Sequence, residues 1–498
     1  METNINFLSA GYPLTELQKS YVIGRDEEEI ATKVIYELTV PTADIVRIEK
    51  AVDKTIISQP AINSRLSDGL FLRIKNRTES YHIQITDLTN VSESEQKNFL
   101  DEEFEKCKLR IWNGNDGYPV HISAVKLSDC DTRFILDFDM LIFDGMSIKL
   151  FVDKVQYFYE NPEEEPVCDY SFFSYCLERE KLPETKNYKK ARDFWLSKKA
   201  KLSQAPDIPH YNSDMTGQNA VFDRCSLFVE ETEWSRIKSN ILKNNIQPYV
   251  LMLAVYAKML SSYSGLSRFT VNVPIANRKS LSSGTIGDFT SVLLVDINIE
   301  QTNMKQLSEH IQKQIITALK NRKFDGIEVM REIAGRDDAE SARFPVVFTP
   351  MLYDDFSISY NSPFGVIVRG CSQTTNVLLD CQIYEYQNGL YINLDYRRNS
   401  FDKKIMYRMF SLICDDIRSF SDEKSFTDEN FIGRILDSDE KEILRYNDTG
   451  CDIPAGNLME LLVSGFEQDK KKVAVSCRNE IITYGELWEK SEQVCNYI

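Results

Sequence analysis

Residues 132–147 read TRFILDFDMLIFDGMS. The part that ends at Phe143 is rich in aromatic and branched side chains, which favour a β-strand. Asp144-Gly145 interrupts this run. Apolar residues then recur at helical spacing to about Tyr159. The stretch therefore predicts a strand, a tight turn and a helix.

Two carboxylates, Asp139 and Asp144, bracket four apolar residues at this turn, and Ser147 follows. Because apolar surroundings disfavour an ionised carboxyl, such acids must be paired or have a shifted pKa. One interpretation is an acid pair at a catalytic junction. The other is structural, with Asp144 in a buried ion pair and Ser147 capping the helix. We favour the structural role for all three residues.

Similar patterns extend on both sides of this stretch. Thr15 and Gln18 fit a capping box, which predicts the start of a helix. In the second half we expect helices near 247–262 and 305–322, with a strand near 268–275 between them.

A hairpin and a long helix complete the second half. NVLLDCQIYEY and LYINLDYR flank Gln387-Asn388-Gly389, and Asn-Gly between two such runs predicts a β-hairpin. An amphipathic helix is expected at 403–420. Strands and helices mixed in two successive blocks predict an α/β (α+β) protein with two lobes.

The composition narrows the class of protein. The chain has 498 residues, of which 42% are hydrophobic and 27% charged, and a formal net charge of −17. This acidity disfavours nucleic acid as a partner. We expect no membrane span and no signal peptide, and hence a cytoplasmic protein. The 11 cysteines form no CxxC pair and the 4 histidines have no zinc-type partner, so we expect reduced thiols and no metal site.

One local stretch is basic despite the acidic chain. The favoured interpretation is a solvated helix face, and the alternative is a patch for an acidic protein partner or a phosphate. Its residues are Lys186, Lys189, Lys190, Arg192, Lys198, Lys199 and Lys201. An HxxxD spacing from His210 to Asp214 also occurs, and we interpret it as coincidence because no strand precedes it.

The DxxxxDxxS pattern of Asp139, Asp144 and Ser147 resembles the signature of heterocyclization domains of nonribosomal peptide synthetases. Ordinary condensation domains carry HHxxxDG at that place. Further segments resemble motifs of the same family, in the family's order: residues 12–25, 191–195, 272–278 with Asn277 and Arg278, 287–290 with Asp288 and Thr290, 345–349, and 373–382.

The resemblance implies a fold and a division of the chain. We expect two chloramphenicol-acetyltransferase-like lobes in a V-shaped pseudo-dimer with a central tunnel. The lobes would be residues 1–185 and 186–434, with a linker at 435–456. Residues 457–498 resemble the opening of an adenylation domain, without its nucleotide-binding motifs. We expect a helix near 457–467 in this segment.

The resemblance also implies an activity. The domain would join a carrier-bound acyl or aminoacyl thioester to carrier-bound cysteine, serine or threonine, and would then cyclodehydrate the product to a thiazoline or oxazoline in antibiotic or siderophore biosynthesis. The partners would be donor and acceptor peptidyl or aryl carrier domains and a downstream adenylation domain in cis. Substrates would arrive on phosphopantetheine arms, and no cofactor is expected to bind directly.

Ring closure requires delivery of a proton, for which a carboxyl of raised pKa is suited. Asp380 lies inside the first hairpin strand, where Asp is disfavoured. A solvent-facing strand or a buried ion pair would also explain it. The resemblance assigns Asp380 to cyclodehydration. Thr349 could relay a proton or simply end its strand, and Gln382 could position the substrate amide. The family usually has Ser where Pro350 stands, so the backbone conformation at Thr349 does not follow from the family motif.

The resemblance further motivates a hypothesis for Asp144, namely an ion pair with Arg278 across the lobe junction. Two other functions remain open. One is a condensing enzyme that forms the amide without closing the ring, and the other is a catalytically silent scaffold that binds carriers.

Overall fold

The computed structural model describes residues 10–77, 79–112, 114–115, 117–211, 216–278, 284–300, 303–334, 343–352, 362–433, 435–450, 460, 462–463, 466, 469–477 and 480–497. The chain divides into two compact units, Met1–Arg434 and Ile435–Ile498.

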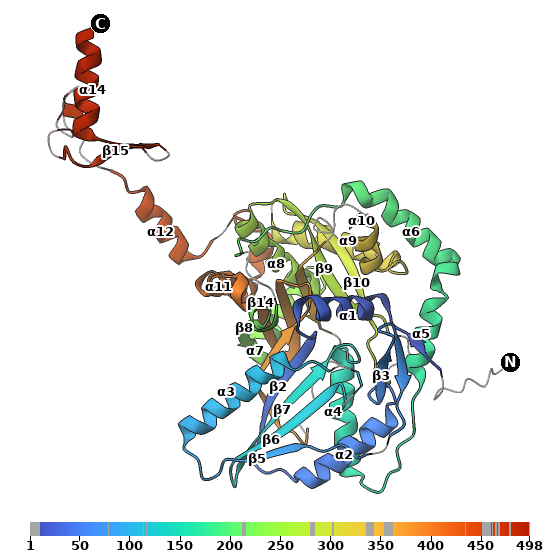
Figure 1. The fold of residues 1–498 in the computed structure, drawn as a ribbon. Coiled ribbons are helices and arrows are strands. Elements are labelled where there is room, and N and C mark those ends of the chain that lie inside the picture. The colour runs from blue at the N-terminus through green and yellow to red at the C-terminus, as the bar shows by residue number, and fades with distance from the viewer. Residues whose placement is uncertain are drawn as a thin grey trace. The chain divides into compact units, whose positions relative to one another are not determined.

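The first half of unit 1 is built on a five-stranded sheet. Its order is β12 (Val366–Gln373), β2 (Lys33–Val40), β7 (Asp131–Asp139), β6 (Val120–Ser128) and β5 (Gln84–Asp87). The helices of this half are α1 (Glu16–Glu28), α2 (Ile45–Ser58), α3 (Glu93–Leu109), α4 (Gly145–Glu160) and α5 (Ser171–Glu180). The helices α2 and α4 pack together, and α3 lies against β2 (Figure 1). A small sheet of β1 (Tyr12–Pro13), β4 (Phe71–Ile74) and β3 (Ser64–Ser67) completes this half.

The second half of unit 1 is built on a six-stranded sheet. Its order is β10 (Thr290–Asn298), β9 (Arg268–Ala276), β11 (Val346–Met351), β13 (Leu379–Tyr386), β14 (Gly389–Arg397) and β8 (Phe222–Val229). Its helices are α6 (Lys186–Lys198), α7 (Glu231–Lys243), α8 (Pro248–Ser264), α9 (Met304–Lys320), α10 (Gly326–Ala334) and α11 (Lys403–Ser419). The helix α8 packs against both α9 and α11.

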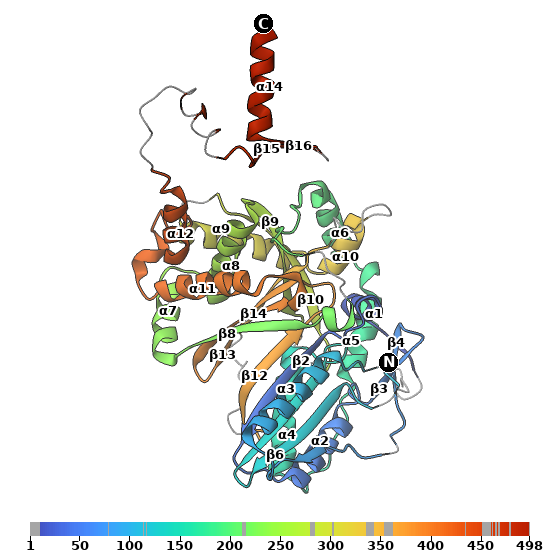
Figure 2. The ribbon, with the colours of Figure 1, turned by 60° about the vertical axis from the view of Figure 1, so that its left-hand side comes forward.

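The strand β12 joins the two halves. It follows β11 in the sequence, yet it pairs antiparallel with β2 of the first sheet, from Val366 opposite Thr39 to Gln373 opposite Lys33. Figure 2 shows this orange strand beside the blue and cyan strands of the first sheet. A linear division at residue 185 therefore leaves one strand of the first sheet in the later part of the chain.

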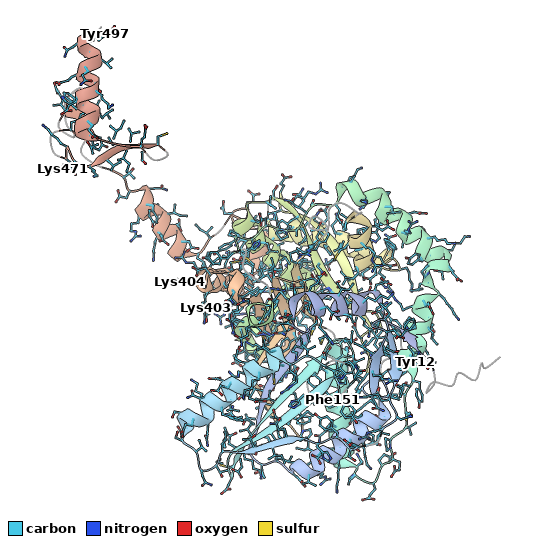
Figure 3. All side chains as sticks on the ribbon, viewed as in Figure 1. Tyr12, Phe151, Lys403, Lys404, Lys471 and Tyr497 are labelled. Carbon is cyan, nitrogen blue, oxygen red and sulfur yellow. The ribbon has the colours of Figure 1, made fainter. Side chains whose placement is uncertain are left out.

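The core of unit 1 also continues from one half to the other. One buried cluster contains Ile35 and Phe104 from the first half together with Phe222 and Val347 from the second. Burying apolar surface that both halves share favours their association. Figure 3 shows side chains filling the space between the ribbons, with Phe151 of α4 in the first half, where it is fully buried.

Most of the expected local elements are present. The helix α1 begins after Thr15, with both bonds of the capping box formed. The hairpin of β13 and β14 turns at Gln387 and Asn388, whose φ angles are 52° and 57°. These positive φ angles are those that Asn tolerates best among residues with a side chain.

The strand expected at 132–143 is shorter than predicted. β7 ends at Asp139, and Ile142 N and Phe143 N both donate to Asp139 O within the turn that follows. The apolar residues of this turn are buried although they are not in a strand. The apolar composition of residues 140–143 therefore indicated burial, but the prediction that they belong to the strand was wrong.

The basic stretch forms α6 and the turn after it. Ala191 and Trp195 bury one face of α6, while Lys186, Lys189 and Lys190 are exposed. This exposure agrees with the solvated helix face that the charge pattern favoured. Asp214, the second residue of the HxxxD spacing, lies outside the described residues.

Unit 2 contains α12 (Asp437–Asn447), a hairpin of β15 (Val473–Cys477) and β16 (Glu480–Thr483), and α14 (Tyr484–Tyr497). The expected linker at 435–456 thus includes a helix. The helix expected near 457–467 falls largely outside the described residues. Among the helices described in either unit, none is long and apolar enough to cross a membrane.

Candidate active site

The turn between β7 and α4 meets the second half of unit 1 through a buried ion pair. Asp144 Oδ1 accepts a hydrogen bond from Arg278 Nη2 at 2.7 Å, and both side chains are largely buried. The guanidinium of Arg278 also lies 4.3 Å from the ring centre of Phe289. The ion pair hypothesised between Asp144 and Arg278 is therefore present.

Ser147 does not cap α4. Asp144 is the N-cap and accepts from Ser147 N at 2.7 Å, because a carboxylate before a helix satisfies its free N–H groups. The Ser147 hydroxyl instead donates to Gly287 O at 2.8 Å and accepts from Gly287 N at 3.0 Å. Ser147 thus connects α4 to residues 287–290.

Asp139 ends β7 and holds α1 in place. Arg25 Nη2 donates to its two carboxylate oxygens at 2.9 and 3.0 Å, and Leu141 N donates to Oδ1 at 3.0 Å. The acid is buried and fully engaged. These contacts join the end of β7 to α1.

A second buried acid lies beside the junction. Asp288 is 1% exposed, and its Oδ1 accepts from Thr290 N at 3.0 Å. Its Oδ2 has no hydrogen-bond partner among the described residues. Burial, with the neighbouring charge of Asp144, raises the pKa of Asp288 to about 8. Asn277 N donates to Phe289 O at 3.0 Å and so holds the same loop.

Thr349 and Asp380 lie on the neighbouring parallel strands β11 and β13. Thr349 Oγ1 donates to Asp380 Oδ1 at 2.8 Å, and Gln382 Nε2 donates to Asp380 Oδ2 at 2.8 Å. Asp380 is 6% exposed. A solvent-facing position therefore does not describe it, and its two hydrogen bonds come from neutral groups.

The electrostatic setting of Asp380 suits proton transfer. Burial raises its pKa to about 7, with a further upward contribution from Asp395, while the hydrogen bonds from Gln382 and Thr349 act in the opposite direction. A carboxyl of this kind is populated in both protonation states near neutral pH.

Arg224 and Asp395 complete the network, although neither was among the residues expected from the sequence. Arg224 Nε and Nη2 donate to the two oxygens of Asp395 at 2.6 Å each, and Nη2 also donates to Gln382 Oε1 at 3.0 Å. Both are charged residues inside strands, Arg224 in β8 and Asp395 in β14. Because a buried charge inside a strand needs a partner, the positions of Arg224 and Asp395 in the sequence are a signal of the same kind as that of Asp380.

The sheet register explains why these residues meet. Arg224 on β8 lies opposite Asp395 on β14, and Asp395 lies opposite Asp380 on β13. On the next strand, Thr349 of β11 lies opposite Gln382 of β13. Directly opposed residues on neighbouring strands share one face of a sheet. Their side chains therefore form two adjacent polar rows.

A cavity of about 340 Å³ opens against these rows. The first half of unit 1 contributes Tyr21 and Tyr36 to its wall, and the second half contributes Thr349, Asp380 and Gln382. The expected candidates for catalysis thus line a space that both halves enclose. Asp144 and Thr290 also lie on its wall.

Pro350 does not displace Thr349. It lies within β11 opposite Ile383, and the Thr349 hydroxyl still reaches Asp380. Because proline has neither a hydroxyl nor a backbone N–H, position 350 adds no donor to the cavity wall. Thr349 is the hydroxyl that this part of β11 supplies to Asp380.

Comparison with known proteins places this geometry in a family. Residues 9–424 match the family model described as Condensation domain. Bacitracin synthase 1 of Bacillus licheniformis is 28% identical over 500 residues, covering 98% of this chain and 9% of that protein. Phenyloxazoline synthase MbtB of Mycobacterium tuberculosis is 24% identical over 422 residues, covering 82% of this chain and 29% of that protein.

The fold agrees with a solved structure. The cyclization-docking bidomain of EpoB, a nonribosomal peptide synthetase from Sorangium cellulosum, superimposes with a TM-score of 0.77 at 25% identity, over 84% of this chain and 87% of that one. The chain spans less than a third of the length of both curated relatives. Because the family model covers most of unit 1, the chain belongs to the condensation domain family.

Proposed function

We propose that the chain acts as a heterocyclization domain, which first forms an amide and then closes and dehydrates a thiazoline or oxazoline ring. The observation that carries this proposal is Asp380, a buried acid with a pKa near 7 that accepts a hydrogen bond from Thr349 at the wall of a shared cavity. The names of MbtB, a phenyloxazoline synthase, and of the EpoB cyclization bidomain support it.

The first step is condensation, for which positioning supplies much of the acceleration. The amine of a carrier-bound cysteine, serine or threonine attacks the carbonyl of the donor thioester. The C–S bond breaks, and the departing thiolate of the donor's phosphopantetheine arm takes up the proton that the amine loses. The cavity between the two halves is where the thioesters would meet.

The second step is ring closure. The side-chain thiol or hydroxyl adds to the new amide carbonyl, and its proton ends on the carbonyl oxygen, which gives a cyclic adduct that carries a hydroxyl group. Loss of water then requires a proton for that hydroxyl as its C–O bond breaks. Asp380 supplies it through Thr349, whose own hydrogen moves to the leaving oxygen. The Asp380 carboxylate finally recovers a proton from the ring nitrogen, so the catalyst is regenerated and one water is released.

The other candidate residues act around this centre. Asp144, Ser147 and Arg278 hold the junction of the two halves, as their contacts support. Asp139 holds α1 against β7, and Asp288 orders the residues before β10. Gln382 was expected to position the substrate amide. Because its amide bonds Asp380 and Arg224, we assign it to the positioning of Asp380.

Partners and neighbouring domains follow from the same proposal. Donor and acceptor carrier domains would present the substrates on phosphopantetheine arms, and the domain itself would need no cofactor. Residues 1–185 and 186–434 would be the two lobes, with β12 crossing between them. Residues 457–498 would begin an adenylation domain in cis.

A reconstitution with loaded carriers tests the proposal. The chain is incubated with a donor carrier that bears a benzoyl or an aliphatic aminoacyl thioester and an acceptor carrier that bears cysteine, serine or threonine. Mass spectrometry of the acceptor thioester then separates three outcomes. The amide mass less one water supports heterocyclization. The amide mass alone indicates a condensation-only domain, and carrier binding without product indicates a silent scaffold.

Two substitutions tie the reaction to the site. Asp380→Ala and Thr349→Ala are expected to leave the amide product and to remove or slow the loss of water. Unchanged ring formation in the Asp380 variant would contradict the role of this acid.

A further inference from the structure

We infer that Arg224, held by Asp395, is a positioning residue for ring closure, because it fixes the amide of Gln382 in the one orientation that donates to Asp380. The inference rests on the proposed heterocyclization activity and adds residues to it. Neither Arg224 nor Asp395 belongs to the segments by which the sequence resembles its family.

The pair itself is buried and joined by two hydrogen bonds. The side chain of Arg224 is 10% exposed and that of Asp395 is 1% exposed. Two parallel N–H···O bonds of 2.6 Å join the guanidinium to the carboxylate. Such a bidentate arrangement defines the plane of the guanidinium as well as its position. The N–H groups of Arg224 that do not bond Asp395 therefore point in fixed directions.

That direction determines how Gln382 points. Arg224 Nη2 donates to Gln382 Oε1 at 3.0 Å, which leaves Nε2 of the amide to donate to Asp380 Oδ2 at 2.8 Å. A flipped amide would place its NH₂ group against the guanidinium and its oxygen against the Asp380 carboxyl. Both contacts would be repulsive or unsatisfied, so the network specifies a single orientation.

The orientation of Gln382 decides where the proton of Asp380 lies. Thr349 donates to Oδ1 when the carboxyl is ionised. With Oδ2 accepting from Gln382, the acidic proton of the protonated form belongs on Oδ1, where it donates to the Thr349 oxygen and leaves the hydrogen of Thr349 to turn toward the cavity. The proton is thus held on the oxygen from which Thr349 can pass it into the cavity. Without Arg224, either oxygen of Asp380 could carry the proton. The proton would then lie on Oδ1, beside Thr349, for a smaller fraction of the time.

The pair also acts on the acidity of Asp380. The ionisable groups that interact with Asp380 come from several elements: Asp395 on β14, Arg224 on β8, Tyr21 on α1, Tyr256 on α8 and Cys381 on β13. Burial and Asp395 raise the pKa of Asp380, whereas Gln382, Thr349 and Arg224 lower it. Loss of the Arg224 cation, with Asp395 left uncompensated, should move the pKa of Asp380 upward.

The experiment isolates ring closure from condensation. A carrier bearing a preformed N-benzoyl-cysteinyl thioester is given to the full chain, and release of water is followed by mass spectrometry from pH 5 to 9. Arg224→Gln is expected to lower the maximal rate on the order of 10- to 100-fold, since a displaced reacting group has effects of that size. Its alkaline limb should also move to higher pH, and Arg224→Lys should recover part of the rate because it restores the charge.

A double-mutant comparison tests whether Arg224 acts through Gln382. Gln382→Met removes the amide at similar volume. If the inference holds, adding Arg224→Gln to Gln382→Met should slow ring closure far less than it does alone, because the two changes interrupt one chain of contacts. Equal effects in both backgrounds would show that Arg224 acts by another route and would overturn the inference.

Folding is controlled in two ways. The double variant Arg224→Gln/Asp395→Asn leaves no unpaired charge in the sheet, and it should still form amide in the two-carrier assay while ring closure remains slow. Lys258→Met/Asp416→Asn disrupts another buried pair, between α8 and α11, whose two side chains are 0% exposed. It should lower the melting temperature without moving the alkaline limb of ring closure.

The outcomes distinguish this inference from the proposed function. If wild type releases no water from the preformed substrate, the heterocyclization proposal fails. If wild type closes the ring and Arg224→Gln keeps both its rate and its alkaline limb, the role of Arg224 fails while the proposed function stands.

Discussion

Asp380 combines burial with two neutral hydrogen-bond donors, and the balance between them places its pKa at about 7. Burial alone would hold the proton too tightly for transfer, whereas an exposed carboxyl would have lost it at neutral pH. A group poised near the working pH can both donate and recover a proton, which is the requirement for dehydration with turnover.

This balance predicts a pH dependence for ring closure. Because the protonated form of Asp380 is the proposed donor, ring closure should fall as the pH rises through about 7. Asp380→Asn should lose roughly 10²- to 10⁴-fold in rate, the range for removal of a general acid, and its residual rate should lack that fall. The measurement is water loss from a preformed acyl-cysteinyl thioester. If the rate of ring closure by Asp380→Asn falls over the same pH range, the titrating group is not Asp380.

Asp144 works at the scale of an element, since it caps α4 and also pairs with Arg278 of the second half. Asp144→Ala removes both contacts and leaves the arginine buried without its carboxylate. We expect a loss of about 3–5 kcal/mol in the free energy of unfolding, together with lower activity, measured by chemical denaturation.

The control for Asp144 is an exposed ion pair. Arg268 and Asp296 are 53% and 20% exposed, and Arg268→Ala should change the free energy of unfolding by less than about 1 kcal/mol. An Asp144→Ala protein as stable as the Arg268→Ala protein would contradict the structural assignment.

Asp288, which lies just before β10, predicts a second effect of pH, this time on stability. Burial and Asp144 raise the pKa of Asp288 from 3.8 to about 8 in the folded chain. Folding then favours the protonated form, so the stability associated with this group is complete below about pH 4 and is lost as the pH rises toward 8. Asp288→Asn keeps the acceptor for Thr290 N and removes the titration.

The melting temperature of Asp288→Asn minus that of wild type should therefore increase steadily from pH 5 to pH 8. Asp207→Asn, at an exposed carboxyl, serves as the matched control. A difference between Asp288→Asn and wild type that stays constant over this range would show that Asp288 does not bind its proton more tightly when folded.

At the scale of the whole of unit 1, the strand β12 crosses from the later part of the chain to pair with β2 of the first sheet. Gly365 precedes β12 with a φ of +85°, and a Cβ there would lie 1.9 Å from Thr39 O of β2. Gly365→Ala must therefore move backbone away from backbone. We expect it to displace β12 and to lower both the melting temperature and the yield of folded protein.

Gly265 offers the comparison. It follows α8 with a φ of +68°, and a Cβ there would meet nothing within 4 Å. Gly265→Ala should cost only the strain of the left-handed backbone, about 1–2 kcal/mol. If the two variants melt alike, the approach of Gly365 to β2 is not what holds the crossing.

Local sequence determined the pieces of this protein. The capping box at Thr15, the hairpin at Gln387-Asn388 and the helix after Asp144 depend on residues a few positions apart, and all three are present. Acids placed inside apolar runs also pointed to Asp144 and Asp380, because burying a carboxyl requires a partner wherever it lies. The two-lobed fold implied by the family motifs is confirmed by the agreement with the EpoB bidomain.

The family resemblance had already named Arg278 as the partner of Asp144. Tertiary structure alone added Arg224 and Asp395 to the network around Asp380. Arg224 meets Gln382 across 158 positions of sequence, and β12 pairs with β2 rather than with the sheet of its sequence neighbours. Ser147 was expected to cap α4, but its hydroxyl bonds Gly287, which is 140 positions away in the sequence. Local patterns specify which face of an element is buried, whereas strand order and register depend on the packing of distant elements, and that packing set the polar rows around Asp380.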